Sequence, residues 1–170
     1  MSQSNQNKRQ LSSLLPDTVN KSGSVQLPEF DRSLPMSLLR AREAVMSKFI
    51  PSLKEHGLSA QQWRVIRSLE QEDGIDISEL SKRCYLLKPS MSRIVQNLES
   101  RELIERRNVA SDQRRTTLYL TQDGREIVKL IAPKSEERYR FISRQFGNGK
   151  LELLQELLED LVNSINEDEQ

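Results

Sequence analysis

Residues 77–106 read ISELSKRCYLLKPSMSRIVQNLESRELIER, and this stretch decides the fold. It predicts a short helix over 78–85 capped by Ser78, a tight turn and a second helix over 89–101, which are the proportions of a helix-turn-helix. The second helix has an apolar face made by Met91, Ile94 or Val95, and Leu98. Its other face carries small polar groups and one cation: Ser90, Ser92, Arg93, Gln96 and Asn97. Because Arg pairs with guanine and Gln or Asn with adenine, this face has the groups needed to read base edges.

A β-hairpin is predicted directly after this helix pair. Two strand-like runs, Ile104–Val109 and Thr116–Leu120, are joined by a polar link at 110–115, and the second run alternates in polarity. A shorter β-like run, Ile75–Ile77, precedes the pair. The sequence therefore predicts a mainly α fold with a small β-hairpin wing, that is, a winged helix-turn-helix joined to a helical dimerisation lobe.

The 170-residue chain is almost neutral, with 26 Lys and Arg against 25 Asp and Glu, but its charge is segregated along the sequence. Residues 80–125 hold ten basic and five acidic side chains. Residues 149–170 hold one basic and seven acidic side chains. We therefore expect the basic middle to contact phosphates and the acidic end to lie in the lobe that faces away from nucleic acid.

An amphipathic helix and a second, shorter one are predicted on the N-terminal side of this region. Ser33 caps the first helix, whose apolar stripe consists of Leu34, Leu38, Ala41, Val45 and Phe49. Pro51 is expected to bend or end this helix, and His56–Gly57 closes it. Ser59 then caps the second helix, which turns Trp63, Ile66 and Leu69 inward.

Two more helices are predicted on the C-terminal side. Thr121 caps a long helix that runs to about Phe146, with a kink expected at Pro133. After a break at 147–149, a final helix carries a coiled-coil seam of Leu151, Leu154, Leu158, Leu161 and Ile165. These seams need a partner, so we expect a dimer interface formed by Leu34, Leu38, Leu151, Leu154, Leu158 and Leu161.

These patterns divide the chain into four parts. Residues 1–32, rich in Ser, Gln and Asn and without sustained periodicity, are predicted to be a disordered tail. Residues 33–57 and 126–166 form the helical dimerisation lobe, residues 58–125 the winged helix-turn-helix lobe, and residues 167–170 an acidic tail.

The composition excludes several functional classes. One Cys (Cys84) and one His (His56) rule out a disulfide framework and a Cys- or His-rich metal site. No phosphate-binding loop or nucleophile motif occurs, and no apolar run approaches the length of a membrane helix. We therefore expect a cytoplasmic protein that is not an enzyme and that uses no cofactor or metal.

Several motifs together resemble the MarR-type transcriptional regulators. Ile77–Ser81, Leu87–Val95 and Leu103–Arg106 resemble that family's helix-turn-helix. Asp112–Arg115 matches its D-x-R wing signature, and Leu120–Gly124 matches the L-T-x-x-G that follows. The resemblance implies a homodimer whose two recognition helices enter successive major grooves of a pseudo-palindromic operator.

The resemblance also implies roles in the wing. Asp112 and Arg114 are expected to pair and shape the hairpin, with Arg115 or Arg107 nearer the DNA. Arg114 is also suited to a narrow, A·T-rich minor groove.

One departure from the family pattern concerns Lys88. The family often has Ser at this position, where it caps the recognition helix. Lys cannot accept hydrogen bonds from backbone N–H groups, so the cap is lost, at a cost of about 1 kcal/mol. We therefore assign Lys88 a contact with the DNA backbone rather than with a base.

Residues 37–46 and 61–65 resemble a narrower subgroup that regulates homoprotocatechuate and related aromatic-acid catabolism. This implies an effector, a small aromatic carboxylate or its thioester, that releases the protein from DNA. The residues expected to line its site offer apolar walls, guanidinium groups and a hydroxyl: Ser37, Arg40, Arg42, Met46, Phe49 and Trp63. Equally, Trp63 can be interlobe core and the two arginines surface charges paired with Glu43 or another neighbour.

Three readings therefore stand beside one another. The first is a ligand-responsive regulator of an aromatic-acid operon, which we expect to be a repressor. The second is a redox-sensing repressor that uses Cys84, whose thiol pKa nearby Lys82 and Arg83 would lower. The third is a helical dimer that binds DNA without sequence preference.

Overall fold

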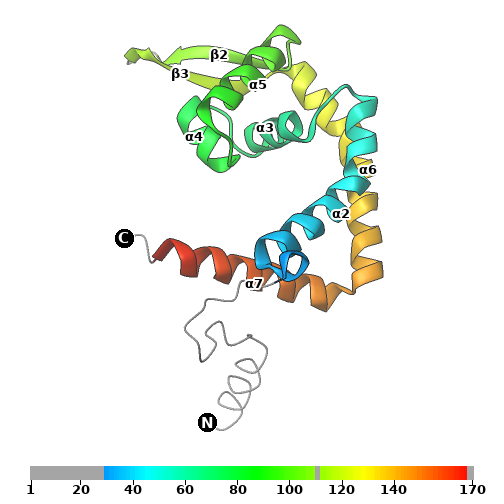
Figure 1. The fold of residues 1–170 in the computed structure, drawn as a ribbon. Helices are drawn as coiled ribbons and strands as arrows, with labels where there is room; N and C mark the ends of the chain where they lie inside the picture. Colours follow the sequence, from blue (N-terminus) through cyan, green and yellow to red (C-terminus); the bar gives the residue numbers. More distant parts are fainter. Residues whose placement is uncertain (1–28, 110–111, 168–170) are drawn as a thin grey trace. The chain divides into compact units, whose positions relative to one another are not determined.

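The structure is a computed structural model that describes residues 29–109 and 112–167 (Figure 1). Residues 109, 112–115 and 167 are described by their backbone alone. The chain divides into two compact units, residues 1–44 and 45–170. Most of the predicted disordered tail (residues 1–28) and most of the predicted acidic tail (residues 168–170) lie outside the described residues.

The first unit contains the 3-10 helix η1 (Phe30–Arg32) and the first half of helix α2 (Leu34–Glu55). The prediction that the tail extends to residue 32 is wrong for η1, which is a formed turn. The hydroxyl of Ser33 donates to the carbonyl of Phe30 over 2.9 Å, while the Ser33 carbonyl accepts from the Ser37 N–H over 3.0 Å. Ser33 thus begins α2 with its backbone, and its side chain closes η1.

Helix α2 continues through Pro51 to Glu55, so of the two expected effects of Pro51, a bend or an end of the helix, the end does not occur. Phe49 and Leu53, on either side of the proline, are 7% and 1% exposed. Their burial holds the segment helical against the local cost of the proline. Pro133 likewise lies inside one continuous helix, α6 (Gln122–Phe146).

Three helices form the next part of the second unit. Helix α3 (Ala60–Gln71) begins at the predicted cap, Ser59, and buries Val65, Ile66 and Leu69. Helix α4 (Ile77–Arg83) is capped by Asp76 rather than by the predicted Ser78. Asp76 Oδ1 accepts from the N–H groups of Ser78 and Glu79 over 2.9 and 3.0 Å. Helix α5 (Lys88–Ser100) follows after a short turn and packs on α4 (Figure 1).

The second unit also contains a three-stranded antiparallel sheet, with strand order β1-β3-β2. Strand β1 (Ile75–Asp76) pairs with β3 (Asp112–Leu120), which also pairs with β2 (Ile104–Val109). The hairpin prediction is confirmed, but the predicted start of the second strand at Thr116 is wrong, because the β3 backbone begins at Asp112. The polar link is therefore short, and its residues 110–111 lie outside the described part of the chain.

One hydrophobic core joins the helices to the inner face of this sheet. Leu118 faces Ile75 on one side and Arg106 on the other in the strand register. Its side chain is 1% exposed. The core is drawn from α2, α3, α4, α5, the strands and α6, including Leu53, Ile66, Leu80, Met91, Val95, Leu98, Ile104, Leu118, Val128 and Ile131.

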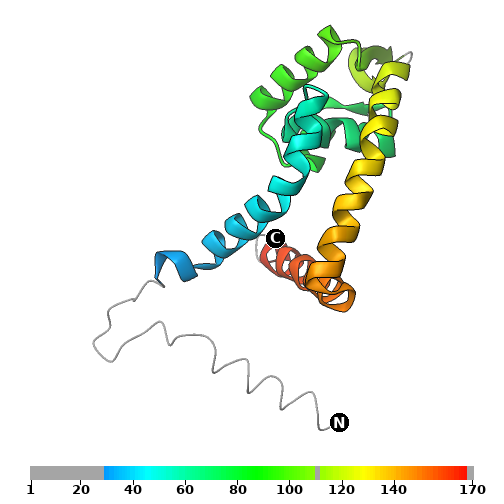
Figure 2. The ribbon, with the colours of Figure 1, turned by 90° about the vertical axis from the view of Figure 1, so that its right-hand side faces the viewer.

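The last two helices are long and follow each other directly (Figure 2). Helix α6 starts at the predicted cap, Thr121, whose hydroxyl accepts from the Gly124 N–H over 3.0 Å. It ends at Gly147, which has φ of 95°, and α7 (Asn148–Glu167) begins at the next residue. The predicted break at 147–149 is thus a single residue long. Within the part of the chain that the structure describes, no helix combines the length and apolarity needed to span a membrane.

Candidate DNA-binding surface and ligand cavity

Helix α5 separates an apolar face from a polar one, as its sequence predicts. Met91, Val95 and Leu98 are fully buried. The predicted polar residues are all exposed: Lys88, Ser90, Ser92, Arg93, Gln96 and Asn97. Because this exposed face carries one Arg, hydroxyl groups and amides but no carboxylate at these positions, it can offer hydrogen bonds to base edges without repelling phosphates.

The start of α5 differs from the prediction by one residue. Leu87, not Lys88, occupies the N-cap position, and no side chain caps the helix. Lys88 is the first helical residue and Pro89 follows it in the first turn, where a missing N–H costs nothing. Helix α5 therefore lacks a side-chain cap, as predicted, but the residue that fails to supply it is Leu87 and not Lys88.

Asn97 of α5 is hydrogen-bonded to another helix. Its Oδ1 accepts a 2.6 Å hydrogen bond from Nε2 of Gln62 in α3. Gln62 also completes the capping box of α3, since its Oε1 accepts from the Ser59 N–H over 2.7 Å. Asn97 therefore keeps its amide N–H groups for another partner, and Gln62 is a positioning residue that the sequence reasoning missed.

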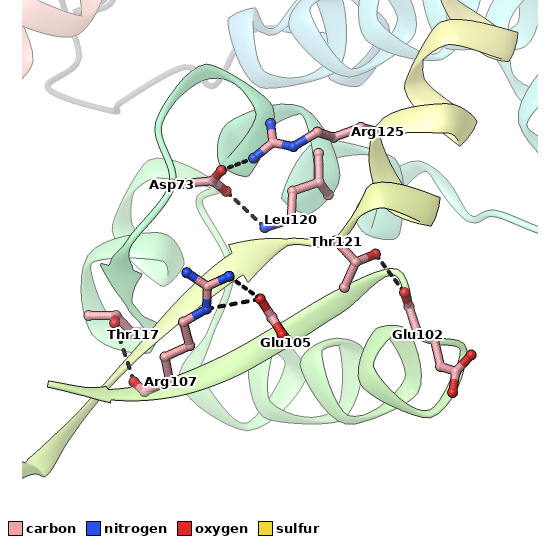
Figure 3. Close-up of polar contacts among 8 residues, drawn as sticks. All are labelled: Asp73, Glu102, Glu105, Arg107, Thr117, Leu120, Thr121 and Arg125. Atoms are coloured by element: carbon pink, nitrogen blue, oxygen red, sulfur yellow. Dashed lines mark hydrogen bonds and ion pairs between the residues drawn. The ribbon is translucent and has the colours of Figure 1, made fainter.

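Arg107 is held on the outer face of the wing (Figure 3). Its Nε donates to Glu105 Oε1 over 2.9 Å, and its Cζ lies 4.3 Å from the centre of the Tyr119 ring. The Thr117 hydroxyl donates to the Arg107 carbonyl over 3.3 Å. Glu105 and Tyr119 are paired across the strands, which places both beside Arg107. The two-residue spacing of Glu105 and Arg107 on one strand is the signal that could have predicted this pair.

The other end of the wing is tied to its surroundings by a second set of bonds (Figure 3). Asp73 accepts from the Leu120 N–H over 2.8 Å and forms an ion pair with Arg125 of α6. The Thr121 hydroxyl donates to the Glu102 carbonyl over 2.6 Å. These bonds fix the base of the hairpin against α6.

The remaining wing predictions concern side chains outside the described part. The backbone of Asp112 pairs with Val109, next to a register shift after Asn108. The side chains of Asp112, Arg114 and Arg115 are not among those described, so their roles stay predictions.

A cavity of about 260 Å³ lies among α2, α3 and α6. Phe49 and Tyr139 form one aromatic wall, with ring centroids 5.0 Å apart and planes at 57°. Arg67 and Glu136 bring charge, and Arg67 is ion-paired with Glu70. The full lining is Phe49, Trp63, Arg67, Ala132, Ser135, Glu136 and Tyr139. The arrangement combines apolar ring surfaces with a guanidinium, hydroxyl groups and a carboxylate, so Arg67 supplies the positive charge that a small aromatic anion needs, and Glu136 opposes it.

The structure brings together only part of the predicted effector set. Phe49 and Trp63 line the cavity, and Met46 does not. The other three predicted residues belong to the first compact unit, where Arg40 donates to the Asp31 carbonyl over 2.9 Å and Arg42 pairs with Glu43. Their contact with an effector, like that of Ser37, stays a prediction. Arg67 was missed, although its position one helical turn after Trp63 is a usable signal.

Cys84 lies in the core beneath the turn between α4 and α5. It is fully buried, and this burial raises the pKa of its thiol despite the nearby Arg64 guanidinium. Arg83, expected to lower that pKa, is instead bound to Glu72 and Glu79. A thiol that is buried and neutral is a poor redox sensor.

Comparisons with known proteins agree on one family. The profile of the MarR family matches residues 56–115. The homoprotocatechuate degradative operon repressor of Escherichia coli is 38% identical over 139 residues, which cover 80% of this chain and 94% of that protein. The chain belongs to the MarR family.

Solved structures of MarR-family proteins have the same fold. The structure of transcriptional regulator PA4135 superposes with a TM-score of 0.73 and 40% identity, covering 77% of this chain and 96% of that one. NadR in complex with 4-hydroxyphenylacetate superposes with a TM-score of 0.69 and 34% identity, covering 81% and 97%. In this winged helix-turn-helix fold, α4 and α5 form the helix-turn-helix and the β2–β3 hairpin forms the wing.

Helix α7 of this MarR-family chain leaves an apolar stripe exposed. Leu154 and Leu158 of the predicted seam are 39% and 38% exposed, and Leu151 and Leu161 are half-buried. Leu34 and Leu38 in the first unit are also exposed. An apolar stripe of this length on one helix is typical of a surface covered by a partner. The dimer contact itself stays a prediction.

Proposed function

We propose that this MarR-family protein is a homodimeric repressor of an operon for aromatic-acid catabolism, and that it is not an enzyme. The observation that carries the proposal is the exposed polar face of α5, presented beside the wing without a carboxylate among Ser90, Ser92, Arg93, Gln96 and Asn97. The matched relative in Escherichia coli is named as the repressor of such an operon, which supports the same role here.

The exposed seam of α7 and the geometry of operator binding support the proposed dimer. A pseudo-palindromic operator presents two half-sites about 34–36 Å apart, which two recognition helices related by a two-fold axis can occupy. The division into a dimerisation lobe (33–57 and 126–166) and a winged lobe (58–125) is part of this proposal.

The effector is a small aromatic carboxylate that enters the cavity lined by Phe49, Trp63, Arg67 and Tyr139. Its ring packs on the aromatic wall, and its carboxylate replaces Glu70 as the partner of Arg67. The volume of about 260 Å³ favours a free acid with one ring over a coenzyme A thioester. NadR, which is 34% identical, was crystallised with an acid of this class. By binding preferentially to a conformation that does not fit the operator, the acid releases the DNA.

The experiment is a titration of purified protein onto its own upstream DNA and onto a random duplex of equal length at fixed salt. 4-Hydroxyphenylacetate, 3,4-dihydroxyphenylacetate and a hydroxycinnamate are then added in turn. The wild type should prefer the upstream duplex and be released by one of these acids. Arg67→Gln should bind the operator but should not be released by the acid. The control is Arg144→Gln, at an exposed position that belongs neither to the cavity nor to α5, and it should respond as the wild type does.

Each failure has a separate meaning. Equal binding to both duplexes would contradict the proposed repressor and support a dimer that binds DNA without sequence preference. Specific binding that no acid relieves would contradict the effector assignment and keep the regulator. Release by peroxide in the wild type but not in Cys84→Ser would establish the redox reading instead.

A further inference from the structure

The turn between α4 and α5 displays two large side chains to solvent. Tyr85 is 83% exposed and Leu87 is 78% exposed, more than any other large apolar or aromatic side chain among the described residues. Single exposed apolar residues are common and need no explanation. Tyr85 and Leu87, however, lie in one four-residue turn directly before α5, where together they form an exposed patch with an aromatic hydroxyl and an apolar side chain.

The backbone of this turn is fixed. The N–H groups of Tyr85 and Leu86 donate over 3.0 Å to the carbonyls of Lys82 and Ser81. Arg64 of α3 donates over 2.6 Å to the carbonyl of Cys84. The side chains of Tyr85 and Leu87 are thus carried on a rigid support that holds them outward, which lowers the entropy lost on binding a partner.

Both positions hold a residue that local conformation disfavours. Tyr85 has φ of 49°, in the left-handed region where Gly is the favoured residue. Leu87 stands at the N-cap of α5, where Ser, Thr, Asp or Asn would satisfy a free N–H group and Leu cannot. At each position, an exposed large side chain replaces a residue that would stabilise the local backbone conformation. Strain of this kind points to a function for the side chain.

The surroundings of the patch fit DNA. Lys82 and Lys88 flank it, both exposed, and neither forms an ion pair with another described residue. Leu87 lies three positions ahead of Ser90, which begins the exposed polar face of α5. The first residues of a recognition helix lie at the base edges, and the residues just before them lie at the rim of the groove.

We propose that Tyr85 and Leu87 contact the operator directly, an inference that rests on the proposed DNA-binding function. The Tyr85 hydroxyl donates a hydrogen bond to a backbone phosphate, as Tyr side chains do in DNA complexes. Leu87 packs against the C5-methyl group of a thymine at the groove edge, an apolar contact that other bases do not offer. Leu87 is then a specificity-determining residue, and Tyr85 contributes affinity without sequence preference.

The test uses the full-length protein and two substitutions that repair the local conformation. Tyr85→Gly accepts the positive φ, and Leu87→Ser supplies the missing cap, so the thermal midpoint of each variant should equal or exceed that of the wild type. Each should nevertheless bind the upstream duplex about tenfold or more weakly, the scale of one lost hydrogen bond to a charged group or one lost base contact. Gln71→Ser, at an exposed position at the end of α3 and outside the proposed dimerisation lobe, is the control and should bind as the wild type does.

A second measurement isolates the thymine contact. An upstream duplex in which uracil replaces every thymine lacks the C5-methyl groups, so wild-type affinity should fall relative to the natural duplex, and the fall should be smaller for Leu87→Ser. Affinities of both variants within about twofold of the wild type would overturn the proposal and reassign the patch to a protein partner. A loss of thermal stability in parallel with binding would also overturn it. If the wild type itself fails to prefer the upstream duplex, it is the proposed function that has failed.

Discussion

Gln62 connects the start of α3 to the recognition helix: its Oε1 lies 2.7 Å from the Ser59 N–H donor and its Nε2 lies 2.6 Å from Asn97 Oδ1. One amide therefore serves as half of a capping box and as the support of a candidate base-reading residue. Because the two functions use different atoms of the same side chain, they can be separated by a single substitution.

Gln62→Glu should keep the cap and lose the support. A carboxylate still accepts from the Ser59 N–H but cannot donate to Asn97. We expect a thermal midpoint close to that of the wild type and a weaker preference for the operator over random duplex. Gln61→Glu adds the same charge at an exposed neighbouring position and is the control. Equal loss of preference in both variants would attribute the effect to charge alone.

Glu105→Gln should strengthen DNA binding several-fold. The substitution removes the carboxylate that holds Arg107 and leaves the guanidinium stacked on Tyr119 with its charge available to a phosphate. One additional phosphate contact should also steepen the dependence of log affinity on log salt by about 0.9. Glu126→Gln on α6, which removes a carboxylate paired with Lys129, controls for net charge. An unchanged salt dependence in Glu105→Gln would show that Arg107 does not reach the DNA.

Two glycines should respond in opposite directions to alanine. A Cβ at Gly124 would lie 2.2 Å from the Leu103 carbonyl oxygen and 2.7 Å from a Leu120 methyl, so Gly124→Ala should lower the free energy of unfolding by about 1–3 kcal/mol. A Cβ at Gly149 in α7 meets nothing within 4 Å, so Gly149→Ala should raise it by about 0.4–1 kcal/mol. Chemical denaturation of both variants would measure this. Similar losses in the two would mean that the close approach at Gly124 is not what limits stability.

The thiol of Cys84 should be unreactive in the folded protein and should make stability depend on alkaline pH. Burial raises its pKa above the ordinary 9.0, so the folded state keeps the proton longer than the unfolded state does. The stabilisation is complete below the unfolded pKa and is lost as pH rises through the folded pKa. The free energy of unfolding of the wild type should therefore fall more steeply above about pH 9 than that of Cys84→Ala. Rapid alkylation of the native thiol at pH 8 would contradict this.

Leu158→Asp should weaken operator binding without altering a DNA-contacting residue, and Leu154→Asp should act in the same way. A carboxylate in the exposed stripe of α7 opposes the apolar contact with a second copy, and loss of the second half-site should lower affinity about a hundredfold. Sedimentation and DNA titration of the same sample measure both effects. Asn163→Asp, an equal charge on another face of α7, should have little effect. A Leu158→Asp protein that remains dimeric and binds normally would contradict the assigned interface.

The sequence by itself determined the order of the elements and the two faces of α5. Apolar residues recurring with the helical period fall on one side wherever the helix packs, so Met91, Leu98 and one of Ile94 and Val95 could be assigned to the core without knowing their neighbours. The structure shows that Val95 is the fully buried one of the two. Ser59 and Thr121 were predicted as caps for the same reason, since a cap is a contact between residues three positions apart.

Only the tertiary structure decided the features that depend on distant residues. The burial of Phe49 and Leu53 keeps α2 helical through Pro51, and the sequence around the proline does not predict this continuity. The cavity joins Trp63 of α3 to Tyr139 of α6, and Arg107 finds Tyr119 through the register of two strands. Local helix propensity amounts to about 1 kcal/mol or less for most residues and about 3 kcal/mol for proline, whereas burying a large apolar side chain contributes about 1.5–3 kcal/mol. Two such buried side chains, Phe49 and Leu53, therefore outweigh the cost of Pro51.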